Sequence, residues 1–192
     1  ALRGDRRVGV VFHGHPLLYS NPAQMLIRHC ETAGIALEIQ SGVSSMDGIF
    51  TALKTDVGAT GLQVFDVNRL LLYRLRPATH TPCLLFQIGS FGSALITRKL
   101  DNAAGRFKPL ERYLRRVYPA GHPAFVVECA SEPGRADLVL KTTVDGLDKV
   151  AARINYNSTL YIPAGARPPR PDPRFLKTLR DPSKVARITR AR

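Results

Sequence analysis

Mostly apolar runs alternate with amphipathic stretches along the chain, and turn residues separate them. Short apolar runs at residues 8–12, 35–39, 62–65, 82–88, 124–129 and 158–162 are typical of buried strands, and residues 137–143 are a weaker candidate. Apolar residues at helical spacing predict helices over residues 22–33, 46–53, 67–75, 109–117 and 144–154. Because strands and helices take turns, the pattern predicts an α/β fold with right-handed crossovers.

Turn and capping residues indicate where the first helices begin and end. Asn21 is expected to cap the first helix, with Pro22 in its first turn, and Gly34 to end it. The second helix is expected to be capped by Ser44 or Ser45.

A glycine-containing break at residues 56–61 is the expected boundary between two lobes. Pro163 is expected to end the second lobe. The predicted division is therefore the remainder of an N-terminal α/β lobe (residues 1–58), a C-terminal α/β lobe (residues 59–163) and a basic tail rich in Pro and Arg (residues 164–192).

Composition limits the classes of protein to which the chain can belong. The chain has 192 residues, 44% of them hydrophobic, which suffices for one core or for two small lobes that share a cleft. It has no apolar stretch long enough to span a membrane and no signal-peptide pattern at residues 1–7. Its three cysteines (Cys30, Cys83, Cys129) form no CxxC pair, which favours buried reduced thiols over disulfides or structural zinc. We therefore expect a cytoplasmic protein.

The positive charge is concentrated at the C-terminal end. Of the net charge of +13, residues 165–192 contribute +7, from nine Lys or Arg against two Asp, together with five of the 14 prolines. Such an arm could bind nucleic acid or an acidic surface, or it could simply be solvated. Only one aromatic residue, Phe175, lies among these charges, so the pattern does not favour nucleic acid as a partner.

The sequence FHGHP at residues 12–16 is the first candidate for chemistry. A glycine turn between a strand and a helix presents small ligands to backbone amides. His13 and His15 could supply two metal ligands, but no further ligand stands at suitable spacing, so no metal site is predicted. The pattern favours a turn that packs against a cofactor, while a simple strand-to-helix turn remains the alternative.

Two further positions offer polar groups at strand ends. The turn at residues 41–45 (SGVSS) carries hydroxyls and backbone N–H groups but lacks the Lys of a phosphate-binding loop. Gln87 closes an apolar strand, where an amide can read an adenine or a carboxylate edge, or can simply be a satisfied polar residue at the rim of a sheet. Asp47 is best explained as a carboxylate in the first turn of a helix.

Taken in order, these motifs resemble the tetrapyrrole methylase superfamily of S-adenosylmethionine-dependent methyltransferases. The Gly-His-Pro form of the first turn is most similar to the branch that contains the borosin peptide α-N-methyltransferases. The resemblance covers residues 7–163 and is carried by residues 12–16 (FHGHP), 21–22 (NP), 42–50 (GVSSMDGIF), 85–92 (LFQIGSFG), 122–123 (HP) and 158–163 (STLYIP).

The resemblance implies a two-lobed α/β fold with S-adenosyl-L-methionine in the cleft between the lobes. By position, it implies cofactor contacts from eight residues: His13, His15, Leu18, Ser45, Gln87, Cys129, Ser158 and Thr159. Two positions depart from the branch, since His13 stands where an aromatic Tyr is usual and Ser41 where Pro is usual.

The resemblance also implies that the N-terminal part of the family domain, with its first strand and glycine-rich turn, is absent from this chain. The Tyr and Arg residues thought to handle the amide lie in that part, so no catalytic residue is predicted here. A truncated first lobe would leave an exposed sheet edge, and we expect the chain alone to have low stability.

The implied function is methyl transfer from S-adenosylmethionine to a peptide backbone amide nitrogen, by a protein that forms a homodimer. Methylation of carbon in a tetrapyrrole precursor of the corrin or sirohaem type is one alternative. A non-catalytic fragment that binds the cofactor is another.

Overall fold

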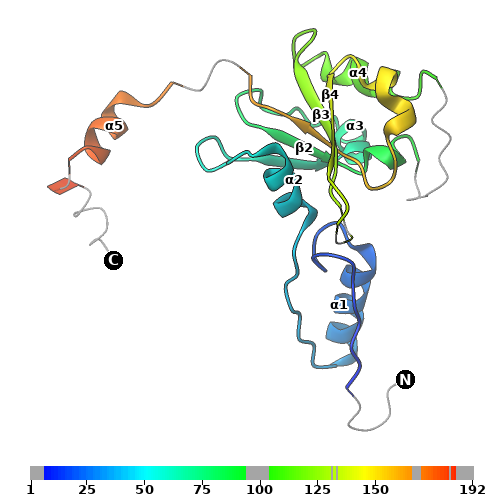
Figure 1. Cartoon of the computed structure of the whole chain (residues 1–192). Coiled ribbons are helices and arrows are strands. Elements are labelled where there is room, and N and C mark those ends of the chain that lie inside the picture. The colour runs from blue at the N-terminus through cyan, green and yellow to red at the C-terminus, as the bar shows by residue number, and fades with distance from the viewer. Residues whose placement is uncertain are drawn as a thin grey trace.

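A five-stranded mixed sheet forms the body of the protein, in the order β1-β2-β5-β3-β4 (Figure 1). The computed structural model describes residues 7–93, 104–130, 132, 134–165, 170–181 and 183–184. β1 runs parallel to β2, and the other pairs are antiparallel. The strands are β1 (Gln63–Asp66), β2 (Cys83–Phe86), β3 (Pro123–Glu128), β4 (Leu138–Thr143) and β5 (Thr159–Ile162). These five strands confirm the predicted α/β class.

Both faces of the central strands are buried, and successive side chains point to opposite faces. On one face Cys83 and Leu85 of β2 join a core made with α3 (Val67–Leu72), α4 (Lys108–Leu114) and the 3₁₀ helix η2 (Leu147–Arg153). On the other face Leu84 and Phe86 pack in a smaller cluster with Ile49 of α2 (Ser45–Leu53). Burial on both faces explains why these strands read as uninterrupted apolar runs.

The first helix, α1 (Asn21–Ala33), lies close to its predicted position. Asn21 was the predicted N-cap, and this is wrong, because the cap is Ser20, whose hydroxyl accepts a hydrogen bond from the Ala23 amide at 3.4 Å. The shift places Pro22 at the second helical position, where its missing N–H costs nothing. Gly34 ends the helix in the left-handed conformation (φ 64°), as predicted.

The second helix, α2, is fixed at its first turn by two hydrogen bonds from Ser44 to the Asp47 carboxylate. Ser44 is the N-cap, and its amide and hydroxyl each donate to Asp47 Oδ2 at 2.8 Å. The predicted role of Asp47 as a first-turn carboxylate is confirmed.

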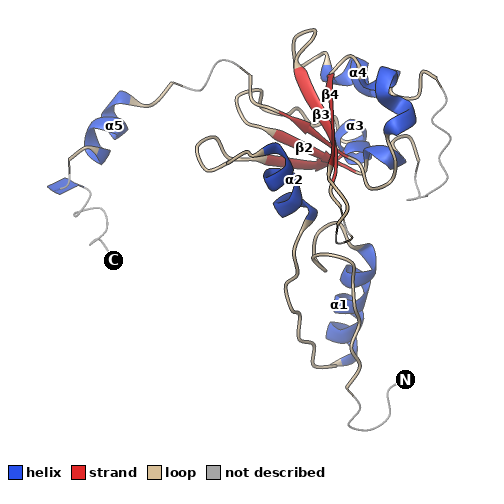
Figure 2. Ribbon diagram, in the orientation of Figure 1, coloured by secondary structure: helices blue, strands red, loops and turns tan. Residues whose placement is uncertain are grey.

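Residues 8–12 and 35–39 were predicted as strands, and both predictions are wrong. Each segment runs beside α1 without regular structure (Figure 2). Among the described residues, the backbones of 8–12 and 36–40 make no hydrogen bond to another backbone group. Val8 is 62% exposed and Val11 96%. An apolar run becomes a strand only when a neighbouring strand pairs with it, and no described strand lies beside either segment.

The two segments instead form the walls of a groove of about 550 Å³, and Leu26 and Ile27 of α1 also line it. α1 and the two segments beside it extend away from the main sheet (Figure 1).

Other elements differ from prediction at their ends. Residues 144–154 were predicted as a helix, but only Leu147–Arg153 is helical, as the 3₁₀ helix η2. α3 ends at Leu72, earlier than the predicted residue 75, and Arg74 just beyond it has a positive φ of 52°. β2 ends at Phe86 because Gln87 leaves the extended conformation.

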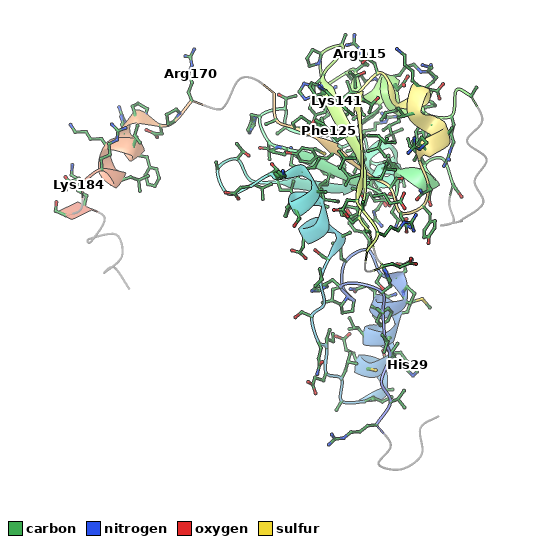
Figure 3. All side chains as sticks on the ribbon, in the orientation of Figure 1. His29, Arg115, Phe125, Lys141, Arg170 and Lys184 are labelled. Carbon is green, nitrogen blue, oxygen red and sulfur yellow. The ribbon has the colours of Figure 1, made fainter. Side chains whose placement is uncertain are left out.

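The described part of the basic tail includes a helix that the sequence pattern did not predict. α5 (Pro173–Leu179) is capped by Asp172, which accepts from the amides of Arg174 and Phe175. It has no buried residue. Figure 3 labels Arg170 and Lys184 on either side of this helix, away from the sheet.

No helix within the described residues is long and apolar enough to cross a membrane. The three cysteines are free thiols; Cys30 and Cys83 are buried, and Cys129 is half-buried.

Candidate functional site

Several strands that carry predicted site residues end at the same edge of the sheet. β2 and β3 both run antiparallel to β5, so their carboxyl ends lie at the edge where β5 begins. β1 is parallel to β2 and ends at the same edge. Gln87, Cys129 and Thr159 therefore come to one edge of the sheet, as do Asp66 at the end of β1 and Ser158 just before β5.

A pocket of about 720 Å³ opens beside the carboxyl ends of β1 and β2. Gln87 lines it and, with φ 63°, is a non-glycine residue in the left-handed region. Such a conformation costs about 1–2 kcal/mol and tends to persist where function requires it. Within the described residues the Gln87 side-chain amide makes no hydrogen bond, so it is free to bind a ligand.

Gln87 is held in place by the turn that follows it. This turn is the 3₁₀ helix η1 (Ile88–Ser90). The Arg106 guanidinium donates to the carbonyl oxygens of Gly89 at 2.7 Å and Phe91 at 2.9 Å. From the other side, Asn68 Nδ2 donates to the Ser90 carbonyl at 3.1 Å.

Leu18, Ser45 and Cys129, all predicted cofactor residues, come together on the α2 face of the sheet. Leu18 and Cys129 pack against the smaller core cluster, and the Cys129 thiol lies 3.7 Å from the Ser45 carbonyl oxygen. A Cβ added to Gly48 would lie 2.8 Å from Cys129 Sγ, so the helix and the thiol are in close contact. Burial, with smaller effects of Asp137 and Glu128, raises the pKa of the Cys129 thiol to about 11, and the thiol is neutral at pH 7.

His13 and His15 lie in the turn before α1. The Leu17 amide donates to His15 Nδ1 at 3.1 Å, which fixes the ring of His15 against its own turn. His13 is exposed. The turn touches the second predicted turn directly, because a Cβ on Gly42 would lie 2.7 Å from the Gly14 carbonyl oxygen.

Asp47 and His15 are electrostatically coupled across these turns. Hydrogen bonds from Ser44 lower the pKa of Asp47, and the nearby His15 lowers it further. Among the described residues no three His, Cys, Asp or Glu side chains gather as metal ligands would.

Ser158 and Thr159 are both buried at the start of β5. The Ser158 hydroxyl accepts a hydrogen bond from the Asn155 amide at 3.0 Å, so it closes the turn that leads into the strand. Neither residue lines the 720 Å³ pocket, and of the eight predicted residues only Gln87 does so.

Sequence reasoning missed most of the residues around this pocket. They include Tyr19, Asp66, Asn68 and Arg69. Tyr19 lies stacked on Phe86 with ring centroids 4.8 Å apart, and it too has a positive φ, of 52°. The position of Asp66 directly after a strand parallel to β2 is a signal that could have identified this end of the pocket.

Comparison with known proteins identifies the family to which these motifs belong. The sequence pattern of the Tetrapyrrole (Corrin/Porphyrin) Methylases matches residues 1–148. The methyltransferase and omphalotin A precursor ophMA of Omphalotus olearius is 32% identical over 161 residues, which are 82% of this chain and 38% of the relative. The gymnopeptides precursor methyltransferase gymMA1 of Gymnopus fusipes is 30% identical over 177 residues, 90% of this chain and 39% of the relative. The chain thus spans less than half the length of these relatives.

Solved structures share the fold at low sequence identity. The cobalt precorrin-4 methyltransferase CbiF matches with a TM-score of 0.55 and 15% identity, over 78% of this chain and 61% of that one. Uroporphyrin-III C-methyl transferase from Thermus thermophilus, solved with S-adenyl homocysteine, matches with a TM-score of 0.53 and 15% identity, over 78% and 62%. The family pattern covers most of this chain, and the predicted resemblance is confirmed: the chain belongs to the tetrapyrrole methylase family.

Proposed function

We propose that this chain is the cofactor- and acceptor-binding part of an S-adenosyl-L-methionine-dependent methyltransferase whose acceptor is a peptide backbone amide nitrogen. The support for methyl transfer is that relatives at about 30% identity are named methyltransferases. The support for the cofactor is that one structure of the same fold holds S-adenyl homocysteine. A homodimer and a cytoplasmic location, which the resemblance implies, are part of the proposal.

In this proposal the eight residues named by the resemblance bind the cofactor. Four of them support it by their geometry. Leu18 and Cys129 pack against the same core cluster, and the Cys129 thiol contacts the Ser45 carbonyl oxygen. Gln87 lies at the same sheet edge, and its amide makes no hydrogen bond to the described residues. The buried pair Ser158 and Thr159 would act by shaping that edge. The sulfonium of the cofactor supplies an activated methyl group, so the chain has to align donor and acceptor and exclude water.

The observation that carries the choice of acceptor is the chemistry of the 720 Å³ pocket. Of the described residues that line it, four carry side-chain amides, and only Asp66 and Arg69 are charged, with opposite signs. Arg69 also lies over the ring of Tyr73, 5.4 Å from its centroid. The amides are those of Asn21, Gln24, Asn68 and Gln87.

Such a lining suits an uncharged, hydrogen-bonding ligand. A tetrapyrrole precursor carries several carboxylates, and each would need a cation nearby when it leaves water. A peptide backbone offers neutral N–H and C=O groups. The side-chain amides of Asn21, Gln24 and Gln87 can match them, because these amides make no hydrogen bond within the described residues. The pocket therefore favours a peptide acceptor.

Methylation of a tetrapyrrole is the second candidate, because the structural neighbours are named cobalt precorrin-4 and uroporphyrin-III methyltransferases. A fragment that binds cofactor without turnover is a third, since the chain spans 38% of its relative from Omphalotus olearius.

Calorimetric titration of the chain with S-adenosylhomocysteine tests the proposal. We expect one-site binding that Gln87→Ala weakens about tenfold, the loss expected for hydrogen bonds to one amide. Gln40→Ala is the matched control, because Gln40 lies in the groove beside α1 and not in the pocket. Absence of binding in the wild-type chain, or an equal loss in both variants, would contradict the cofactor assignment.

A competition experiment then separates the two acceptors. With S-adenosylhomocysteine bound, an uncharged peptide should bind the wild-type chain and uroporphyrinogen III should not. The reverse order of affinities would favour the tetrapyrrole alternative.

A further inference from the structure

Tyr19 and Gln87 are two non-glycine residues in the left-handed region that line the same pocket. They come from different parts of the chain, the turn before α1 and the end of β2. They meet through Phe86, which precedes Gln87 and stacks against the Tyr19 ring at 4.8 Å with an interplanar angle of 24°. Backbone conformations that cost free energy persist where the surrounding structure requires them, and they gather at binding sites.

Two polar side chains that line the same pocket, those of Asp66 and Asn68, already form hydrogen bonds within the fold. The Asp66 carboxylate accepts from the Arg69 amide at 2.9 Å, as the cap of α3. Asn68 donates to the Ser90 and Ser93 carbonyls at 3.1 Å and accepts from the Gly92 amide at 2.9 Å. Both side chains therefore serve the fold.

The Tyr19 hydroxyl differs from them. Within the described part of the chain it makes no hydrogen bond, although the ring is held firmly by its stack on Phe86. Burial, together with the nearby charge of Asp66, raises the pKa of the Tyr19 phenol to about 12, so the group keeps its proton at neutral pH. It is a fixed hydrogen-bond donor at the wall of a pocket.

We propose that Tyr19 binds the methyl acceptor: its phenol O–H donates a hydrogen bond to a carbonyl oxygen of an uncharged peptide, beside the Gln87 amide. A carbonyl oxygen is the strongest acceptor that a neutral peptide offers, and one such bond fixes the register of the peptide in the pocket. No covalent step or proton transfer by Tyr19 is involved. The inference rests on the proposed function, because it assumes that the pocket receives the acceptor.

The test compares Tyr19→Phe with a control outside the pocket, Tyr118→Phe. Both substitutions remove one oxygen atom and leave the ring in place, but Tyr118 is buried in the main core and does not line the pocket. The probe is the uncharged tetrapeptide N-acetyl-Gly-Val-Ile-Gly-amide, titrated calorimetrically into the chain saturated with S-adenosylhomocysteine. Each variant is also titrated with S-adenosylhomocysteine alone.

We expect Tyr19→Phe to weaken peptide binding about five- to tenfold, the effect of losing one net hydrogen bond, with cofactor affinity unchanged within about twofold. Tyr118→Phe should change neither affinity. The inference is overturned if Tyr19→Phe leaves the peptide affinity unchanged, or if it lowers both affinities in parallel. It is also overturned if the wild-type chain binds S-adenosylhomocysteine and not the peptide. A wild-type chain that does not bind S-adenosylhomocysteine refutes the proposed function itself, and the role of Tyr19 with it.

Discussion

The carbonyl oxygen of Asn155 occupies the space where a side chain of Gly89 would begin. Gly89 is the central residue of η1, and Asn155 starts the turn that leads into β5. Gln87 directly precedes η1, and Ser158 ends the turn that Asn155 starts. The contact between Gly89 and Asn155 therefore joins two parts of the candidate site through their backbones. Only glycine allows that approach.

Substitution of Gly89 by Ala should therefore destabilise the protein. The added methyl group would push the two turns apart, at a cost of about 1–3 kcal/mol in the free energy of unfolding. Gly9→Ala is the control, because a Cβ at Gly9 would meet no atom within 4 Å. Urea denaturation followed by circular dichroism measures both. Equal midpoints for Gly89→Ala and wild type would contradict the contact.

Gln87→Gly should raise the stability of the protein and lower its affinity for the ligand. Glycine adopts the left-handed conformation without a penalty, so the variant should gain about 0.5–1 kcal/mol in the free energy of unfolding. It also loses the amide, so its affinity for S-adenosylhomocysteine should fall about tenfold. Thermal denaturation and calorimetry on the same preparation give both quantities. A variant that loses stability as well would show that the conformation of Gln87 is unstrained.

Asp47 should make the stability of the protein depend on pH below about 4. Hydrogen bonds from Ser44 lower the pKa of Asp47 from its ordinary value of 3.8, so folding favours the ionised carboxylate. Its contribution is therefore complete above the unfolded pKa of 3.8 and disappears as the pH falls through the lower pKa of the folded state.

The measurement is the melting temperature of wild type and Asp47→Asn between pH 2 and pH 7. The wild type should melt higher at pH 7, and the difference should shrink below pH 4. A difference that stays constant across this range would show that the carboxylate is not the group responsible. Asp145 and Asp181, whose pKa values are also lowered, titrate alike in both proteins and cancel in the comparison.

Cys129 should react slowly with alkylating reagents although it is half-buried rather than enclosed. With a pKa of about 11 instead of 9, its thiolate fraction at pH 8 is lower by about a hundredfold. Cys30 and Cys83 are buried and should react only after unfolding. Iodoacetamide labelling followed by peptide mass spectrometry gives the order. Rapid labelling of Cys129 in the folded chain would contradict its contact with Ser45 and Gly48.

Residues 8–12 and 36–40 should exchange their backbone amides quickly. Their N–H groups have no backbone partner among the described residues, whereas those of β2 and β5 lie inside the sheet. Hydrogen exchange read by mass spectrometry should show full exchange of both segments within seconds and protection of β2 for minutes or longer.

The sequence predicted correctly those strands whose pairing and packing partners lie within the described residues. β2, β3 and β5 are buried on both faces, so their apolar runs are explained by local partners. The same reasoning failed at residues 8–12, because a run of valines specifies a strand only in combination with another strand that pairs with it. Propensity alone does not supply that partner.

The candidate site was predicted only in part, for a similar reason. Motif positions predicted cofactor contacts from Gln87, Leu18, Ser45 and Cys129, and the structure places these residues at one sheet edge or on its α2 face. The left-handed conformation of Tyr19 and its stack on Phe86 depend on two segments more than sixty residues apart in the numbering, and no local pattern encodes them.

The groove beside α1 has a consequence for the behaviour of the protein in solution. Its two walls carry exposed valines and backbone groups that have no backbone partner among the described residues, so a strand from another molecule could pair with them. Segments of this kind template the addition of foreign strands, and apolar side chains seal such contacts. The chain should therefore self-associate as its concentration rises, and it should do so through its N-terminal segments, while the main sheet keeps its native structure.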